Sequence, residues 1–155
     1  MLGEAISFKV VWHSIYKFHC RKLRKFFHER VVFAGDSAHQ VAPFGARGAN
    51  SGIQDAENLA WKLAYLFNSN RDNPFLIENY NYERIKAAKI NLIEATRSVN
   101  FIVPPNITSK IYRNLILFLS KKFKWPKKFI NSGRLCPPAI YPKSPLIFQD
   151  KDYFN

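Results

Sequence analysis

The stretch between residues 31 and 63 constrains the fold more than any other part of this chain. It joins a short apolar segment, a loop punctuated by glycines, and a helical pattern that begins near Asn50. A strand, a glycine loop and a helix start in this order can hold an anionic or electron-rich ligand against backbone N–H groups. The residues of this stretch are therefore the first candidates for a functional site.

Several residues in this stretch suit a hydroxylated, partly anionic cofactor. Asp36 directly follows the apolar segment, where a carboxylate can accept hydrogen bonds from ligand hydroxyls. Gly45 and Gly48 allow the backbone to approach a flat ligand closely, and Pro43 stiffens the entry to the loop. The N–H groups at the helix start, between Gly48 and Gly52, have no helical partner and add partial positive charge.

Hydrophobic periodicity predicts an α+β or α/β arrangement with two or three strands, then about three helices and an irregular tail. Alternating residues predict a strand over 6–20, or two shorter ones, and the apolar segment predicts another over 31–34. Residues 21–30 read as a charged connector containing a turn or a short helix. The helices are expected at about 50–68, 74–100 and 107–123.

The expected helix over 74–100 has a clear start signal, because Asn73 suits an N-cap and Pro74 suits the first helical position. The preceding helix carries an apolar stripe from Ile53 to Phe67, which we expect to pack in the core. Repeated prolines after residue 125 disfavour regular structure there. We therefore divide the chain into a domain over 1–125 and an irregular, Pro-rich tail over 126–155.

The chain carries a formal net charge of +13 over 155 residues. The excess lies in residues 1–34 and 101–155, whereas residues 35–100 are balanced. No zinc-finger spacing, RNA-binding motif or helix-turn-helix pattern accompanies it, so we expect no nucleic-acid partner. A basic module that binds nucleic acid or an anionic membrane, with the helix over 107–123 on the membrane surface, remains a lesser alternative.

The two cysteines, Cys20 and Cys136, have neither metal-binding spacing nor a disulfide framework, which favours a reducing compartment. The N-terminal residues carry charges where a signal peptide needs an apolar run. The longest apolar run, 115–119, is too short to cross a bilayer. We therefore expect a cytoplasmic protein without a transmembrane segment, and we predict no metal site at His13 and His19.

The run from 31 to 63 resembles the second flavin-binding segment of the class A FAD-dependent aromatic monooxygenases, which have the p-hydroxybenzoate hydroxylase fold. The likeness is greatest to enzymes of the 3-(3-hydroxyphenyl)propionate hydroxylase type. It extends over about residues 6–104 and includes the family's Tyr-x-x-Glu-Arg helix at 80–84. The segment 16–19 with Arg21 is similar to the strand that precedes the motif in that family.

The resemblance implies an FAD site whose residues can be named one by one. Asp36 would bind the ribityl hydroxyls of FAD, and Gly35 would allow the turn that presents Asp36. The loop residues Pro43, Phe44 and Gly45 would line the isoalloxazine ring, close to where oxygen reacts. The backbone N–H groups at the helix start would face the N1–C2=O edge of the ring; these belong to Gly48, Ala49 and Asn50.

The resemblance also implies the chemistry. Members of this family reduce FAD with NAD(P)H and transfer one oxygen atom of O₂ to a phenolic or other aromatic substrate. The flavin carries this chemistry, so no catalytic side chain is assigned. Arg47 occupies a position where the family often has smaller or Gln-like residues, and it faces either the ligand or solvent.

Two elements of the family are missing from this sequence. The G-x-G-x-x-G loop that holds the ADP part of FAD is absent, and so is the middle Asp-Gly segment. We therefore expect an FAD-binding segment of an incomplete enzyme that is inactive alone. An upstream-encoded N-terminal fragment and a small aromatic substrate are its expected partners.

Two further alternatives come from the same residues. In the first, the chain is a non-catalytic remnant of a split gene. The missing glycine loop is the reason for considering it. In the second, Gly35-Asp36-Ser37-Ala38-His39 is a near match to the G-x-S-x-G turn of serine hydrolases, with Ser37 as nucleophile.

Overall fold

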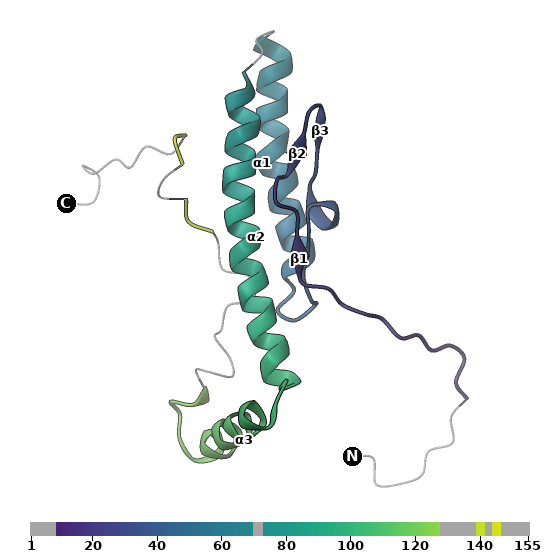
Figure 1. Ribbon diagram of the computed structural model, residues 1–155, viewed down its shortest axis with the longest axis vertical. Helices are drawn as coiled ribbons and strands as arrows, with labels where there is room; N and C mark the ends of the chain where they lie inside the picture. Colours follow the sequence, from purple (N-terminus) through teal and green to yellow (C-terminus); the bar gives the residue numbers. More distant parts are fainter. Residues whose placement is uncertain (1–8, 70–72, 128–138, 142–143, 147–155) are drawn as a thin grey trace, which may run out of the picture.

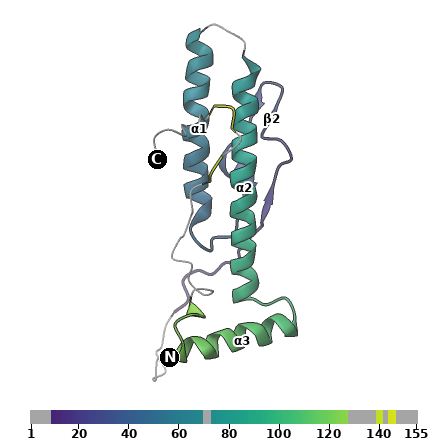
Figure 2. The same cartoon turned by 90° about the vertical axis from the view of Figure 1, so that its left-hand side faces the viewer.

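Two long helices form the frame of the molecule. The computed structural model describes residues 9–69, 73–127, 139–141 and 144–146. Helix α1 (Arg47–Ser69) and helix α2 (Pro74–Ile102) run antiparallel and side by side (Figure 1). Helix α3 (Ile107–Lys122) lies across the far end of α2 (Figure 2). Among the helices that the structure describes, none combines the length and apolarity needed to span a membrane.

The helix boundaries follow the local signals in the sequence. The three predicted helices are confirmed, with shifts of no more than three residues at either end. The Asn73 side chain accepts a hydrogen bond from the Phe75 N–H at 3.2 Å, as the predicted N-cap requires. Asn106 caps α3 in the same way, accepting from the Ser109 N–H at 2.9 Å.

In the described part of the chain, four strands of two residues each lie beside the helix pair. Strand β1 (Arg21–Lys22) pairs antiparallel with β4 (His39–Gln40), and β2 (Phe27–His28) pairs antiparallel with β3 (Val31–Val32). Between β3 and β4 the chain makes one 3₁₀ turn over Gly35–Ser37. This turn contacts the beginning of α1, so the strands bring the Gly-Asp segment to the helix start (Figure 1).

The strand prediction is wrong in three places. Residues 9–20 have no regular structure, and residues 6–8 lie outside the described part of the chain. Their apolar side chains are exposed, Val11 by 92% and Ile15 by 90%, because no described segment pairs with them. The strand expected over 31–34 covers only β3, since the chain turns at Gly35. The connector expected over 21–30 contains β1 and β2 instead.

The expected core stripe of α1 is also wrong, because the buried face of this helix is polar. Ile53 is 68% exposed and Phe67 is 80% exposed. The side chains turned toward α2 recur at helical spacing on another face and are buried or partly buried: Ser51, Asp55, Asn58 and Lys62. They are inside because α2 presents charged and amide groups that pair with them.

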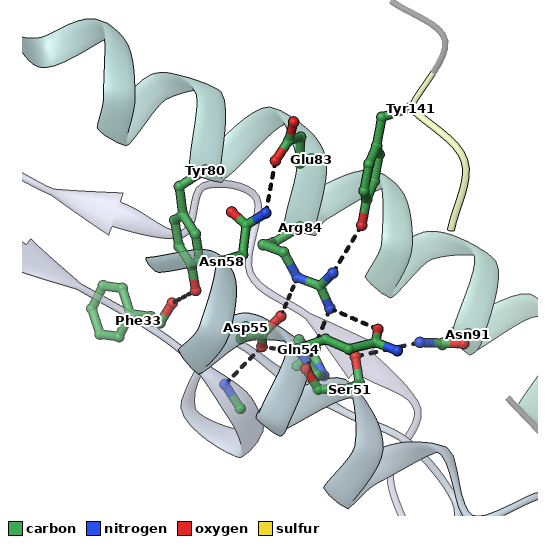
Figure 3. A network of polar contacts seen from close by, with 12 residues as sticks. Phe33, Ser51, Gln54, Asp55, Asn58, Tyr80, Glu83, Arg84, Asn91 and Tyr141 are labelled. Atoms are coloured by element: carbon green, nitrogen blue, oxygen red, sulfur yellow. Dashed lines mark hydrogen bonds and ion pairs between the residues drawn. The ribbon is translucent and has the colours of Figure 1, made fainter. Parts of the chain in front are cut away.

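A small apolar cluster lies between the strands and α2. Phe26, Ala38, Tyr80 and Ala88 form its buried part, and Val32, Phe33, Leu59 and Ile85 pack against them. The Tyr80 hydroxyl donates to the carbonyl oxygen of Phe33 at 2.8 Å (Figure 3). Burial raises the pKa of this phenol well above its ordinary value, so it stays a neutral donor. The hydrogen bond fixes the end of β3 against α2.

The carboxylate of Asp55 joins three segments at the centre of the molecule. Its Oδ2 accepts from the Gly35 N–H at 2.9 Å and from His39 Nε2 at 2.7 Å. Its Oδ1 accepts from Arg84 Nε at 2.5 Å (Figure 3). Burial alone would raise the pKa of Asp55, but the donors His39, Gly35 and Arg84 outweigh it and hold the pKa below its ordinary value. Asp55 is thus a buried anion with all its charge compensated.

A second buried carboxylate, that of Glu83, lies one residue before Arg84 on α2. It accepts hydrogen bonds from Lys62 Nζ at 3.1 Å, Asn58 Nδ2 at 2.8 Å and the Ser144 hydroxyl at 2.5 Å. Burial opposes its ionisation, yet these donors, Ser144 first, hold the pKa of Glu83 below its ordinary value. This group ties α1 and residue 144 to α2.

Replacing Asp55 should be among the most destabilising single changes. Asp55→Asn leaves Arg84 buried without its counter-charge, and we expect a loss of about 3–5 kcal/mol of unfolding free energy. The matched control is Glu94→Gln, which breaks the exposed Arg97–Glu94 pair and should cost less than about 1 kcal/mol. Urea unfolding followed by circular dichroism measures both values. Equal losses in the two variants would contradict a central role for Asp55.

The stability difference between the wild type and Asp55→Asn should depend on pH. Since the folded-state pKa of Asp55 lies below its ordinary value of 3.8, its contribution is complete above that value. The contribution is lost as the pH falls through the folded-state pKa. Unfolding curves measured from pH 7 to pH 3 should therefore show a constant difference near neutrality that shrinks in acid. A difference that grows on acidification would refute the assignment.

Candidate functional site

A hollow of about 520 Å³ opens where the Gly-Asp turn, the loop before α1 and the start of α1 meet. Five of the eight residues predicted for the cofactor site line it: Asp36, Pro43, Gly48, Ala49 and Asn50. The segment around Tyr16 to Arg21 forms the opposite wall. The structure thus brings together residues from three separate stretches of the sequence.

The other three predicted residues adjoin the hollow without lining it. Gly35 has φ +60°, a left-handed conformation that favours glycine, and it presents Asp36. Gly45 has φ +87° and turns the loop ahead of α1. The Phe44 ring lies 6.5 Å from the ring of Phe18 in an edge-on arrangement, and Phe18 itself lines the hollow.

Asp36 is held in position by its backbone while its side chain stays exposed. The turn around it is closed by the Ala38 N–H, which donates to the Gly35 carbonyl at 2.9 Å. The Ser37 hydroxyl adds a bond to the Ala34 carbonyl at 2.8 Å. Since Asp55 also anchors the Gly35 N–H, the turn is fixed from both sides. An exposed carboxylate on a fixed turn is suited to accept hydrogen bonds from a ligand.

The first turn of α1 supplies donors to the same hollow. The N–H groups of Gly48 and Ala49 belong to the first turn of the helix, where no carbonyl of the helix can accept from them. The Asn50 side chain instead donates to the Ala46 carbonyl at 2.7 Å, which closes the turn below it. A 23-residue helix therefore directs its positive end into the hollow.

Arg47 lies in the wall of the hollow, which decides between the two orientations left open by the sequence. It is only 5% exposed, so it does not point to solvent. Within the part of the chain that the structure describes, its Nε and Nη1 have no hydrogen-bond partner. Lys17 and Arg21 also line the hollow, against one carboxylate, that of Asp36. The hollow is therefore positively charged.

These features fit the cofactor that the resemblance implies. A flat, hydroxylated and partly anionic group needs a carboxylate for its hydroxyls, N–H donors for its oxygen atoms, and a concave surface that lets the backbone approach it. Asp36 supplies the carboxylate, the start of α1 supplies the N–H donors, and Gly48 forms part of the concave surface. Two buried guanidinium nitrogens of Arg47 without partners add a reason for an acceptor in the hollow.

The serine hydrolase alternative does not fit the geometry. The Ser37 hydroxyl donates to the Ala34 carbonyl, and Nε2 of His39 is bonded to Asp55. A nucleophilic serine needs a hydrogen bond to its general base, and these two side chains are each engaged elsewhere. Ser37 is a turn residue.

Sequence reasoning did not identify the residues that support the site. Asp55, Arg84 and His39 make the buried network behind the Gly-Asp turn, although all three lie in stretches that carry the family resemblance. The available signal was the i, i+4 spacing of Ser51 and Asp55, a polar stripe on a helix that also has an apolar one. The sequence does not show that these charged residues are buried, because their burial depends on a second helix with complementary charges packing beside them.

Comparison with known proteins identifies the family of most of this chain. The family described as FAD binding domain matches residues 3–95. The 3-(3-hydroxy-phenyl)propionate/3-hydroxycinnamic acid hydroxylase of Mycolicibacterium vanbaalenii is 31% identical over 145 residues. That match covers 91% of this chain and 25% of the relative, so the chain spans about a quarter of the relative's length.

Two solved structures share the fold of this chain. The rebeccamycin biosynthetic enzyme RebC with reduced flavin gives a TM-score of 0.56 at 26% identity, over 75% of this chain and 24% of that one. The p-nitrophenol 4-monooxygenase PnpA from Pseudomonas putida DLL-E4 gives a TM-score of 0.59 at 23% identity, over 81% of this chain and 33% of that one. The family match includes all eight predicted site residues and the helix α1. This chain belongs to the FAD binding domain family.

Proposed function

We propose that this chain holds the ribityl and isoalloxazine parts of FAD within a flavin-dependent monooxygenase that hydroxylates aromatic substrates. The observation that carries the proposal is the joint lining of one hollow by the Asp36 carboxylate and the first turn of α1. FAD, when bound, supplies the redox and oxygen chemistry, with NAD(P)H as the reductant. The chain supplies binding, orientation and charge.

Each group in the hollow has a task in this proposal. Asp36 accepts hydrogen bonds from the ribityl hydroxyls, on a turn that Gly35 makes possible. The first turn of α1, at Gly48, Ala49 and Asn50, would face the N1–C2=O edge of the ring, where the positive end of α1 favours negative charge. The loop over 43–45 would line the ring and help to exclude water from it.

In this proposal, the part of the FAD site that binds ADP comes from sequence outside this chain. The chain spans a quarter of the hydroxylase relative, and its sequence contains no G-x-G-x-x-G loop for the ADP part of FAD. A second polypeptide or a further segment therefore supplies the nucleotide-binding half, and with it most contacts to the aromatic substrate. Catalytic turnover is expected only when both halves are present.

Asp36 offers the direct test of the cofactor site. Asp36→Asn should weaken FAD binding by roughly tenfold or more, because a carboxylate that accepts ligand hydroxyls becomes a poorer acceptor. The matched control is Glu78→Gln, an exposed acid on α2 far from the hollow, which should leave the affinity unchanged. Quenching of flavin fluorescence, with the chain alone and with the upstream-encoded fragment, measures the affinity.

If neither preparation retains FAD, or if both variants bind it equally, the site is wrong. A third outcome is that FAD binds with both halves present but phenolic acids do not raise NADPH oxidation above background. The chain would then bind flavin, and the proposed hydroxylase activity would be wrong. A chain that does not unfold cooperatively would favour the non-catalytic remnant.

Arg47 should show opposite effects on stability and on binding. Arg47→Gln removes a buried cation, two of whose nitrogens have no partner among the described residues, from the positive end of α1, so we expect the ligand-free chain to gain roughly 1 kcal/mol of stability. The same change should weaken FAD binding roughly fivefold, because a charged donor is lost from the hollow. Arg84→Gln is the matched control, since Arg84 is equally buried but paired, and it should lower stability strongly. A loss of stability in Arg47→Gln would show that Arg47 is a structural residue.

A further inference from the structure

The segment around Tyr141 and Ser144 is attached to the same two residues of α2 that organise the buried network. The Tyr141 hydroxyl accepts from Arg84 Nη1 at 2.8 Å. The Ser144 hydroxyl donates to Glu83 Oε1 at 2.5 Å and accepts from Asn79 Nδ2 at 3.0 Å. These contacts span 57 to 65 residues of sequence, so they place a late part of the chain across α2 (Figure 3).

Arg84 is the point at which this segment meets the flavin turn. Its guanidinium is 3% exposed and is shared among neighbours on several sides. Nε donates to Asp55, Nη1 donates to Tyr141, and Nη2 donates to the Ser51 carbonyl at 3.3 Å. Because the fork of the guanidinium is planar and rigid, a partner at one nitrogen restricts the direction of the others.

The line of contacts continues from Asp55 to the cofactor turn. Asp55 uses its other oxygen to accept from the Gly35 N–H, and Gly35 directly precedes Asp36. Four groups in series therefore connect the late segment to the turn: the Tyr141 hydroxyl, the Arg84 guanidinium, the Asp55 carboxylate and the Gly35 amide. Every link is a hydrogen bond that is buried or partly buried.

The Ser144 attachment has no such continuation. Glu83 binds Lys62 and Asn58 on α1, and neither of these side chains contacts the Gly-Asp turn through a described hydrogen bond. The two attachments lie three residues apart in the same segment and rest on adjacent residues of α2. They differ because only the Tyr141 attachment continues through described hydrogen bonds to the Gly-Asp turn.

We propose that Tyr141 is a positioning residue for the flavin turn, acting through Arg84 and Asp55 on the Gly35 amide. The statement that this turn holds FAD rests on the proposed function; the coupling itself does not. Tyr141 does not line the hollow. Its hydroxyl orients Arg84, whose orientation fixes Asp55, which in turn holds Gly35 in its left-handed conformation.

The first test is hydrogen exchange at the Gly35 amide in the full chain, followed by NMR without any ligand. Tyr141→Phe removes one hydroxyl and should speed this exchange roughly threefold or more, which is the range of one hydrogen bond in a buried network. Ser144→Ala removes one hydroxyl from the same segment and should leave the Gly35 exchange rate within about 1.5-fold of wild type. Both variants should lower the thermal midpoint to a similar degree.

A second pair of variants, Arg84→Lys alone and Arg84→Lys combined with Tyr141→Phe, checks the route. Arg84→Lys keeps the charge beside Asp55 but replaces the fork with a single ammonium group. It should speed Gly35 exchange by itself, and adding Tyr141→Phe to it should change the rate no further, because both act along one route. Additive effects of the two substitutions would overturn the proposal. Equal Gly35 exchange in Tyr141→Phe and Ser144→Ala would overturn it as well.

FAD titration then separates this inference from the proposed function. Where FAD binds, Tyr141→Phe should weaken binding roughly threefold and Ser144→Ala should not. If Gly35 exchange responds to Tyr141 as stated but no preparation binds FAD, the coupling stands and the proposed function fails. If FAD binds but Gly35 exchange is indifferent to Tyr141, the proposed function stands and the coupling fails.

Discussion

The carboxylate of Asp55 receives hydrogen bonds from three segments that lie 16 to 29 residues away in sequence. Its position on α1 puts it between the Gly-Asp turn on one side and Arg84 of α2 on the other. Burying a carboxylate costs free energy unless the charge is fully paired. All three donors must therefore stay in place for the buried charge of Asp55 to be tolerated. This requirement fixes the relative positions of α1, α2 and the turn more strictly than a small apolar cluster could.

The polar interior explains the unusual orientation of α1. A helix in a domain of this size normally turns its apolar stripe inward. Here the stripe from Ile53 to Phe67 is on the outer face, while Asp55 and Lys62 are buried against Arg84 and Glu83. The partners of the polar face are all within the described chain. The specificity of their pairing sets the register between the two helices, which places the start of α1 beside Asp36.

The sequence was sufficient for elements whose signals are local. Helix periods predict α1, α2 and α3, and the cap at Asn73 predicts where α2 begins; the structure confirms these predictions. The expected strand over 6–20 failed because a strand exists only through its partner, and alternation alone does not provide one. The buried face of α1 was misjudged for a similar reason. Whether Asp55 is inside depends on Arg84, which lies 29 residues further along the chain.

The candidate site was predictable to the extent that it follows the Gly-Asp motif. Asp36 and the helix start at Gly48 to Asn50 line the same hollow, as the family resemblance implies. Arg47 could be placed only by the structure, since burial without a hydrogen-bond partner is not a property of a sequence. The support behind the motif, through Asp55 and Arg84 to Tyr141, likewise depends on distances between remote residues.

The most direct measurement is an amide NMR titration of the ¹⁵N-labelled chain with FAD. If the central claim holds, the shifts will concentrate on the turn at Gly35–Asp36 and on the first residues of α1, and they will saturate. Shifts scattered over the basic residues of α3 and the segment after it, without saturation, would mean that FAD is attracted only by the positive charge of the chain and that the hollow is not its site.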